Sequence, residues 1–592
     1  MKNAFAIVTL SALLSACAIA PQKPVEPPAE PQPAEPAVAE APAPAPAPVA
    51  EALPNTELTG DLLFRLTKAE LEFKNGQWQG PYITMMALGQ QTRDPRLARR
   101  ATEMALTAKQ PGEAMAAIRL WRSLAPESEE AAQFFLSFAV TADDLGEAEA
   151  LFEQRLKDAK PATRPLLMFQ MQQFLQRAQD KNAAYKLQDR VLMPYEAMLE
   201  PHLILAQGAF ALNDPVRARS EAAKALAIKP DSELAILTSA QVSGDVDNAT
   251  QQLKGFLDKY PQAREVRAAY GRILTDNKQP EEARKQFLLL LKDQPDNLAT
   301  LYALGVLAVQ VNDAAEAEKY LSRFVTVLEE HPDDERNPAK VLHILAELAQ
   351  QRGDLDAAYA WLEKVDESDE KIYLAARIKM AVLTARKGNT DAARKQLEEL
   401  KPSDPNDQAQ VFQTDAQLLR DAGDHRAAYV VLDNATKRYP GNPDLLYDFA
   451  LVAEKLGDVE LMEKALRQVM IAAPDNQHAY NALGYSLAER NERLPEAYSL
   501  IDKAMQMAPG DPFIMDSMGW VQFRMGKLAE AESYLRRAYA LRNDPEIAVH
   551  LGEVLFVKGD IAGAQKLWKE AHAKDPKNDA LKSTLARLNQ SL

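Results

Sequence analysis

The chain has 592 residues, a formal net charge of −16, seven histidines and a single cysteine. Its basic runs are short, as at Arg99-Arg100 and Arg536-Arg537, whereas a nucleic-acid-binding protein presents a clustered basic face. Binding to nucleic acid is therefore a poor explanation of this chain, and solubility is a sufficient explanation of its charge.

The N-terminus has the three parts of a secretory signal. Lys2 supplies a positive charge, residues 4–14 form a short apolar run, and the run ends in the sequence Leu-Ser-Ala-Cys at residues 14–17. The apolar run is about half as long as the ~20 residues that a membrane-spanning helix needs, so the pattern indicates an export signal. We expect residues 1–16 to be this signal peptide.

The Leu-Ser-Ala-Cys sequence resembles the lipobox of bacterial lipoproteins. In that family the signal is cut directly before the cysteine, which is then acylated, so the resemblance implies lipidation of Cys17. Because the chain has no other cysteine, acylation would leave no thiol for a disulfide, a metal site or a nucleophile. The next residue is Ala18 rather than Asp, which by the enterobacterial sorting rule implies the outer membrane, with the folded part facing the periplasm.

A proline-rich stretch follows the cysteine. Residues 18–54 hold 12 of the 37 prolines and lack the large apolar side chains of a core. This composition predicts a disordered, polyproline-like tether over residues 17–56, including the lipidated cysteine. Fully extended, residues 18–54 would reach ~115 Å. We interpret it as a spacer, and a proline-rich ligand for a partner is the alternative.

After the tether, prolines recur with a period of about 34 residues. The intervals are close to this value except for one double interval between 332 and 402, near the acidic stretch at residues 366–370. The periodic prolines lie at 95, 126, 161, 194, 230, 261, 295, 332, 402, 440, 474, 509, 545 and 576. A period of 34 is the length of the tetratricopeptide repeat (TPR).

Small residues recur at fixed places between these prolines. One unit has Leu483-Gly484, then Ala497, Ala504 and Pro509, and similar units follow it and precede it. Each unit resembles a TPR repeat, in which two amphipathic helices pack as a hairpin. Small residues such as Gly484 and Ala497 let the two helices approach closely, a glycine ends the first helix, and proline marks the end of the second.

The chain is thus predicted to be all-α, a TPR superhelical solenoid of about fifteen hairpins. The pattern is clear over residues 264–578, so we assign the TPR array there. The match is weaker over residues 57–263, where residues 62–95 and 163–197 fit the period but lack most of the small residues, and this predicts degenerate TPR-like hairpins there. Residues 579–592, with Leu581, Leu585 and Leu588, are expected to form a C-terminal capping helix.

No catalytic or cofactor motif accompanies the repeats. No two histidines lie three or four residues apart, and neither a phosphate loop nor a Gly-x-Ser-x-Gly elbow is present. The repeats account for nearly all of the chain that is expected to fold. We therefore expect no enzyme activity, no cofactor and no metal, although an enzyme without a recognisable motif stays open as an alternative.

The TPR resemblance also implies where a partner would bind. In TPR arrays the first helix of each hairpin lines a concave groove, and the position after the Leu-Gly pair faces inward, as do the positions one turn on either side. These positions predict a protein-binding groove at Asn481, Tyr485, Trp520, Phe523 and Phe556. Aromatic side chains are frequent anchors at interfaces, and packing between neighbouring helices is the alternative.

A second candidate surface lies at the start of the array. In residues 58–73, one helical face carries Leu62, Leu66, Ala69 and Phe73, whereas Leu63, Phe64 and Leu71 lie off that face. One hairpin cannot bury apolar residues on two sides. The extra residues are expected to pack on a neighbouring hairpin or, alternatively, to dock a partner protein.

The lipobox, the tether and the TPR array together resemble a family of pseudomonad lipoproteins that bind a periplasmic carboxyl-terminal processing protease. The resemblance implies a non-catalytic adaptor on the outer membrane. It would activate the protease and present substrates such as hydrolases of peptidoglycan cross-links. A scaffold of an exopolysaccharide or pilus export machine is the alternative, because TPR lipoproteins also occur there.

Overall fold

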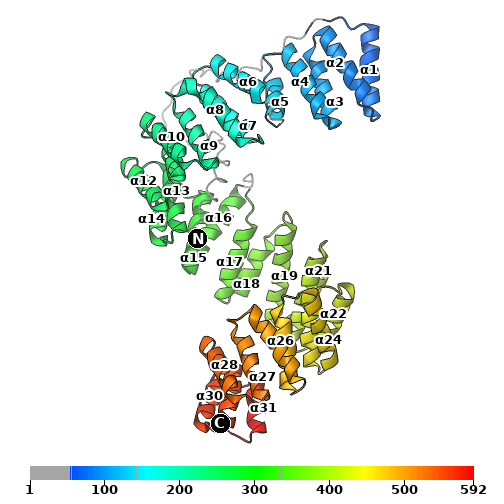
Figure 1. Ribbon diagram of the computed structural model, residues 1–592, viewed down its shortest axis with the longest axis vertical. Coiled ribbons are helices and arrows are strands. Elements are labelled where there is room, and N and C mark those ends of the chain that lie inside the picture. The colour runs from blue at the N-terminus through cyan, green and yellow to red at the C-terminus, as the bar shows by residue number, and fades with distance from the viewer. Residues whose placement is uncertain (1–53, 55, 142–144, 332–335, 592) are drawn as a thin grey trace, which may run out of the picture. The chain divides into compact units, whose positions relative to one another are not determined.

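The computed structural model describes residue 54 and residues 56–141, 145–331 and 336–591. In these ranges the regular structure is helical, with one short 3₁₀ turn and no strand. The helices follow one another in chain order as hairpins (Figure 1). The chain divides into two compact units, one that ends at Asp313 and one that begins at Ala314.

The first unit contains fifteen α-helices and a 3₁₀ turn, η2 (Met193–Tyr195). The helices are α1 (Gly60–Lys74), α2 (Gln79–Thr92), α3 (Pro95–Thr107), α4 (Pro111–Leu124), α5 (Glu129–Thr141), α6 (Leu145–Asp158), α7 (Arg164–Leu175), α8 (Lys181–Leu192), α9 (Leu199–Ala211), α10 (Pro215–Ile228), α11 (Glu233–Val242), α12 (Val246–Lys259), α13 (Arg264–Asp276), α14 (Pro280–Asp293) and α15 (Leu298–Gln310).

The second unit contains sixteen α-helices in its described residues. They are α16 (Ala314–Glu330), α17 (Ala339–Gln351), α18 (Leu355–Glu363), α19 (Glu370–Arg386), α20 (Thr390–Glu399), α21 (Pro405–Asp421), α22 (His425–Arg438), α23 (Pro443–Lys455), α24 (Val459–Ala472), α25 (Gln477–Glu489), α26 (Leu494–Met507), α27 (Pro512–Arg524), α28 (Leu528–Leu541), α29 (Pro545–Val557), α30 (Ile561–Lys574) and α31 (Asp579–Arg587).

Glycine–acid pairs make the turn inside many hairpins of the second unit. Between α29 and α30, Gly559 has φ +92° and so follows the end of α29 in a left-handed conformation. The next residue, Asp560, caps α30 by accepting a hydrogen bond from the amide of Gly563 at 2.9 Å. Gly526 makes the same turn, but Lys527 follows it and α28 lacks a side-chain cap.

Several turns of the first unit use other residues in the same conformation. Lys109, Asn213 and Lys278 have φ of 57°, 60° and 57° and lie between the two helices of their hairpins. A residue with a Cβ is strained in this region, and asparagine tolerates it better than lysine. These turns of the first unit therefore lack the glycine that the same turn has in most hairpins of the second unit.

Close approach of the paired helices explains the second glycine of the repeat. A Cβ on Gly484 would lie 2.6 Å from Ile501 Cγ1 and 3.0 Å from the carbonyl oxygen of Ala497. Gly484 lies on α25, whereas Ile501 and Ala497 lie on α26. The prediction that small residues permit this packing is confirmed.

Those periodic prolines that the structure describes lie between successive hairpins. Pro474 and Pro509 follow α24 and α26, the second helices of their hairpins, whereas Pro95 and Pro545 begin the next hairpin at the first position of α3 and α29. That first position tolerates proline because its N–H has no partner within the helix. The prolines therefore also mark helix starts, in addition to the helix ends that the sequence predicted.

Apolar clusters connect consecutive hairpins. In the second unit, one cluster of buried side chains extends from α21 to α27 and another from α28 to α31. Helix α31 contributes Leu581 to the second cluster, and Leu585 and Leu588 pack against it. The end of the array is thus covered by a short helix.

The predicted signal peptide, Cys17 and most of the proposed tether lie outside the described residues. Among the helices that are described, none combines the length and the apolar character that crossing a membrane would require.

Candidate protein-interaction site

The candidate groove lies on three first helices of neighbouring hairpins, α25, α27 and α29. Helix α27 contacts both α25 and α29. It is enclosed, since every residue from Ile514 to Gln522 is buried. Helix α29 is equally enclosed from Ile547 to Leu555. This part of the array is therefore a packed interior rather than an open trough.

His550 of α29 is the centre of the aromatic cluster. Its ring stacks on Trp520 of α27, with centroids 4.3 Å apart and planes at 23°. The ring of Tyr485 from α25 lies 6.0 Å from His550, and the Tyr485 hydroxyl oxygen lies 3.4 Å from Nε2 of the imidazole. Phe523 packs on Trp520 at 5.1 Å. Side chains from three hairpins thus form one aromatic cluster, in which Trp520 and His550 are stacked.

Asp516 holds the other nitrogen of His550. Its carboxylate oxygens lie 2.9 and 3.0 Å from Nδ1, and both residues are buried. Burial by itself lowers the pKa of His550, but the charge and hydrogen bond of Asp516, with the charges of Glu546 and Glu489, outweigh burial and raise this pKa to about 9. The imidazole is therefore cationic at neutral pH, and it balances the buried carboxylate.

Trp520 is only 2% exposed. Its indole Nε1 donates a hydrogen bond to Glu489 Oε2 at 2.7 Å, and the guanidinium of Arg524 lies 5.8 Å from its ring. Arg524 also donates to the carbonyl oxygen of Glu489 at 3.1 Å. These contacts satisfy the polar edge of Trp520 within the chain, so the indole is not available to a partner in this conformation.

The other predicted groove residues differ in accessibility. Asn481, Tyr485, Phe523 and Phe556 are each half-buried. The side-chain oxygen Oδ1 of Asn481 is buried and has no hydrogen-bond partner. Burial raises the pKa of Tyr485 far above the ordinary value. The structure brings Tyr485, Trp520 and Phe523 together, whereas Phe556 packs on Trp568 of α30, with ring centroids 5.8 Å apart.

A buried ion pair joins the end of the cluster to the capping helix. Glu553 of α29 is 1% exposed, and its carboxylate accepts hydrogen bonds from Arg587 at 2.6 and 2.7 Å. Thr584 of α31 lies 3.5 Å from the same carboxylate. Glu553 occupies the position after Leu551-Gly552, so the inward-facing position holds an acid here in place of an aromatic ring.

Sequence reasoning did not select His550. It occupies the position that holds Ala482 and Ser517 in the two preceding hairpins. A histidine where the neighbouring repeats have small residues was the available signal, because so large a side chain must extend toward another helix.

The second candidate surface, on α1, is open to solvent. Leu63, Phe64 and Leu71 are 51%, 65% and 56% exposed. On the opposite face, Ala69 is buried and Leu66 and Phe73 pack against the first apolar cluster. The extra apolar residues of α1 are therefore not covered by a neighbouring hairpin. Ile83 of α2 is exposed as well.

In the described part of the chain, no group of three or more His, Cys, Asp and Glu side chains has an arrangement that would hold a metal ion. The arrangement that the structure does provide is a series of helical surfaces.

Comparison with known families identifies the repeats. Three tetratricopeptide-repeat models match the chain, the first over residues 243–305, 419–484 and 522–588, the second over residues 276–335 and the third over residues 339–372. These matches and the consecutive helical hairpins show that the chain contains tetratricopeptide repeats and has an all-α solenoid fold.

Curated relatives share parts of the chain. The TPR repeat-containing protein PA4667 of Pseudomonas aeruginosa is 38% identical over 209 residues, which are 35% of this chain and 35% of that protein. Cellulose synthase operon protein C of Pseudomonas fluorescens is 24% identical over 339 residues, which are 50% of this chain and 26% of that protein. The chain thus spans only about a third and about a quarter of these two relatives.

A thermophilic TPR protein of Thermus thermophilus is among the similar solved structures. It is 25% identical, covers 30% of this chain and 97% of its own, and superposes with a TM-score of 0.28.

Proposed function

We propose that the protein is a non-catalytic adaptor, anchored to the outer membrane through acyl chains on Cys17. In this proposal it binds and activates a periplasmic carboxyl-terminal processing protease and presents protein substrates to it, including hydrolases of peptidoglycan cross-links. The lipobox and tether support the anchoring, and the TPR array supports binding to proteins. The 38% identity to a Pseudomonas TPR protein is compatible with the pseudomonad family that the sequence resembles.

The observation that carries this proposal is the uncovered apolar face of α1, made of Leu63, Phe64 and Leu71. These side chains lie on the first helix of the array, next to the proposed tether. Large apolar side chains that cluster on a surface favour a protein interface. We assign this face to docking of the protease, and the exposed parts of the half-buried residues Asn481, Tyr485 and Phe523 to contacts with substrates.

The experiment measures cleavage of a reporter protein by the purified protease with and without the adaptor. We expect the wild-type chain to raise the cleavage rate and the variant Leu63→Ser/Phe64→Ser to lose most of this effect. Ile471 is the matched control, because it is 80% exposed and lies on α24; Ile471→Ser should activate like wild type. A protease that cleaves equally fast without the chain contradicts the proposal.

A scaffold of an exopolysaccharide or pilus export machine is the second candidate. The similarity to cellulose synthase operon protein C over half of this chain supports it. Affinity purification from envelope extracts separates the two candidates. Recovery of the processing protease, lost in Leu63→Ser/Phe64→Ser, supports the adaptor, whereas recovery of export-machine subunits without the protease supports the scaffold.

A further inference from the structure

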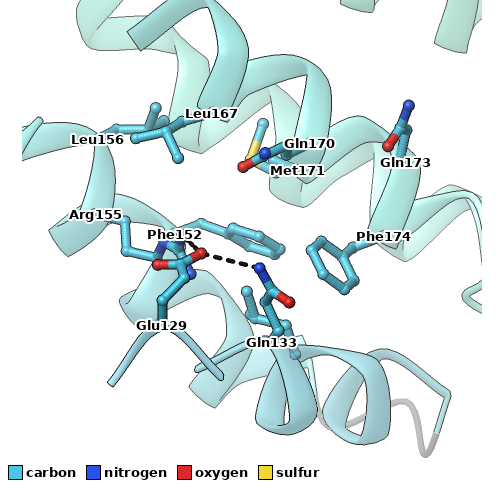
Figure 2. A pocket seen from close by; sticks show the side chains of 11 residues that line it. Glu129, Gln133, Phe152, Arg155, Leu156, Leu167, Gln170, Met171, Gln173 and Phe174 are labelled. Carbon is cyan, nitrogen blue, oxygen red and sulfur yellow. Dashed lines mark hydrogen bonds and ion pairs between the residues drawn. The ribbon is translucent and has the colours of Figure 1, made fainter. Parts of the chain in front are cut away.

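A pocket of about 210 Å³ lies between α5, α6 and α7 in the first unit (Figure 2). Its floor is apolar and comes from all three helices. Four of the floor residues are buried, and Leu167 and Phe174 are half-buried. The buried floor residues are Leu136, Phe152, Leu156 and Met171.

The rim of the pocket is polar but has no unpaired charge. Arg155 donates a hydrogen bond to Glu129 at 2.5 Å, and the amide of Gln133 donates to the same carboxylate oxygen at 3.3 Å. Gln133 lies on α5 and Gln170 on α7, on opposite sides of the pocket (Figure 2). Gln173 also lines it. The rim thus consists of one neutralised ion pair and three amides.

The size of the pocket restricts what it can hold. Cofactors and drug-sized ligands occupy sites of roughly 300–1,000 Å³, so a pocket of about 210 Å³ is too small for them. It has room for one large side chain. The floor offers the paired rings of Phe152 and Phe174, 6.4 Å apart at 47°, together with Met171. A thioether adapts its shape and contacts aromatic rings favourably, so aromatic and long aliphatic side chains fit best.

The rim restricts the charge and the backbone of the ligand. Because Glu129 already neutralises Arg155, an anion would find no free cation, and burial of an unpaired charge is unfavourable. The ligand side chain is therefore neutral. A glutamine amide both donates and accepts hydrogen bonds, as does a peptide unit, so glutamines on two sides of the opening suit an extended peptide backbone.

We propose that the pocket between α5, α6 and α7 binds a bulky apolar side chain of an extended peptide segment, whose backbone pairs with Gln133 and Gln170. This site is separate from the face of α1 and from the aromatic cluster of α25, α27 and α29. The proposal does not require the protease. Its test uses synthetic peptides, so its outcome is independent of the adaptor assignment.

The test follows the methyl NMR signal of Met171 in the full chain, assigned with the variant Met171→Leu. The probes are ten-residue peptides of Gly, Ser and Thr with one central Phe, Leu, Ala or Asp, at up to about 1 mM because a single anchor binds weakly. We expect the Phe and Leu peptides to shift this signal in a saturable manner. The Ala and Asp peptides are expected to leave it unchanged.

Three glutamine variants test the location of the binding site. Gln133→Trp places an indole at the mouth of the pocket and should weaken binding of the Phe peptide about tenfold or more. Gln154→Trp is the matched control, because Gln154 is also exposed, lies on α6 and does not line the pocket; it should bind like wild type. The double variant Gln133→Ala/Gln170→Ala keeps the floor and should weaken binding through the backbone contacts.

Three results would overturn the proposal. One is an equal loss of binding in Gln133→Trp and Gln154→Trp, and another is an Asp peptide that binds as tightly as the Phe peptide. The third is lauric acid that shifts the Met171 signal when the Phe peptide does not, since that would indicate a fatty-acyl site.

Discussion

The ring of Trp520 stacks on the imidazole of His550, with centroids 4.3 Å apart. Both side chains are buried, and they lie on neighbouring hairpins of the array. The imidazole carries a positive charge held by Asp516, so the stack combines an apolar contact with a charged one. Stability of this region is therefore expected to depend on pH.

We predict that the C-terminal hairpins lose stability as the pH rises from about 6.5 to about 9. The pKa of His550 is about 9 in the folded chain and 6.5 in its ordinary state, so its stabilisation is complete below pH 6.5 and is lost as the pH rises through 9. The effect is on the order of 3 kcal/mol. The loss of stability is measured by amide hydrogen exchange in α25, α27 and α29 at a series of pH values.

His550→Gln is the control for this pH dependence. The variant should be less stable than wild type at pH 6, and its exchange should change much less between pH 6.5 and 9. An unchanged slope in the variant would show that other groups cause the pH dependence.

Trp520→Ala is expected to destabilise the C-terminal hairpins by about 3–5 kcal/mol, since it removes a large buried ring. Trp520→Phe keeps much of the apolar contact but loses the hydrogen bond to Glu489, so it should cost less. Urea unfolding followed by circular dichroism compares the two. If Trp520→Ala instead kept full stability and only reduced partner binding, the indole would be a contact residue, as the sequence predicted.

Removal of the positive partner of Glu553 should loosen the capping helix. Arg587→Ala leaves a buried carboxylate unpaired, which costs up to about 3–5 kcal/mol, and less here because the Arg587 side chain is 49% exposed. Rapid hydrogen exchange in α31 is the expected readout. Glu553→Gln/Arg587→Ala should recover part of the protection, and equal exchange in the single and double variants would contradict the role of the ion pair.

Substitutions of the left-handed turn residues should change the stability of the two units in opposite directions. Lys278→Gly relieves a strained φ of 57° and should stabilise the first unit by up to about 1 kcal/mol. Gly559→Ala introduces that strain at φ +92° and should destabilise the second unit by about 1 kcal/mol or more. The midpoint of urea unfolding measures both, and a stabilising Gly559→Ala would contradict the argument.

The hairpins could be predicted from the sequence because the repeat has a strict physical cause. Gly484 must be small where two helices touch, and Pro474 and Pro509 cannot lie inside a helix, so the period of the fold is visible in the chain. The acid that follows the turn glycine in many hairpins, as Asp560 does, is a further signal that the sequence reasoning did not use.

The arrangement of the candidate sites was less predictable. The position of Trp520 on the first helix of its hairpin follows from the repeat. Its burial depends on α25 and α29, the first helices of the two neighbouring hairpins, which pack around it. His550 and the pocket beside Phe174 depend on contacts between hairpins for the same reason. The exposure of Phe64 could be anticipated, because one amphipathic helix has only one face to bury.

The contact between Tyr485 and His550 has a consequence for how the array unfolds. In repeat proteins each unit interacts mainly with its immediate neighbours, so an end unit can detach alone. Tyr485 and His550 lie on α25 and α29, with one complete hairpin between them, so the last three hairpins share a contact that adjacent pairs cannot supply. We expect these hairpins to open as one cooperative block. Duplication of the middle hairpin would separate the two rings, which opposes the gain of single repeats by which such arrays change length.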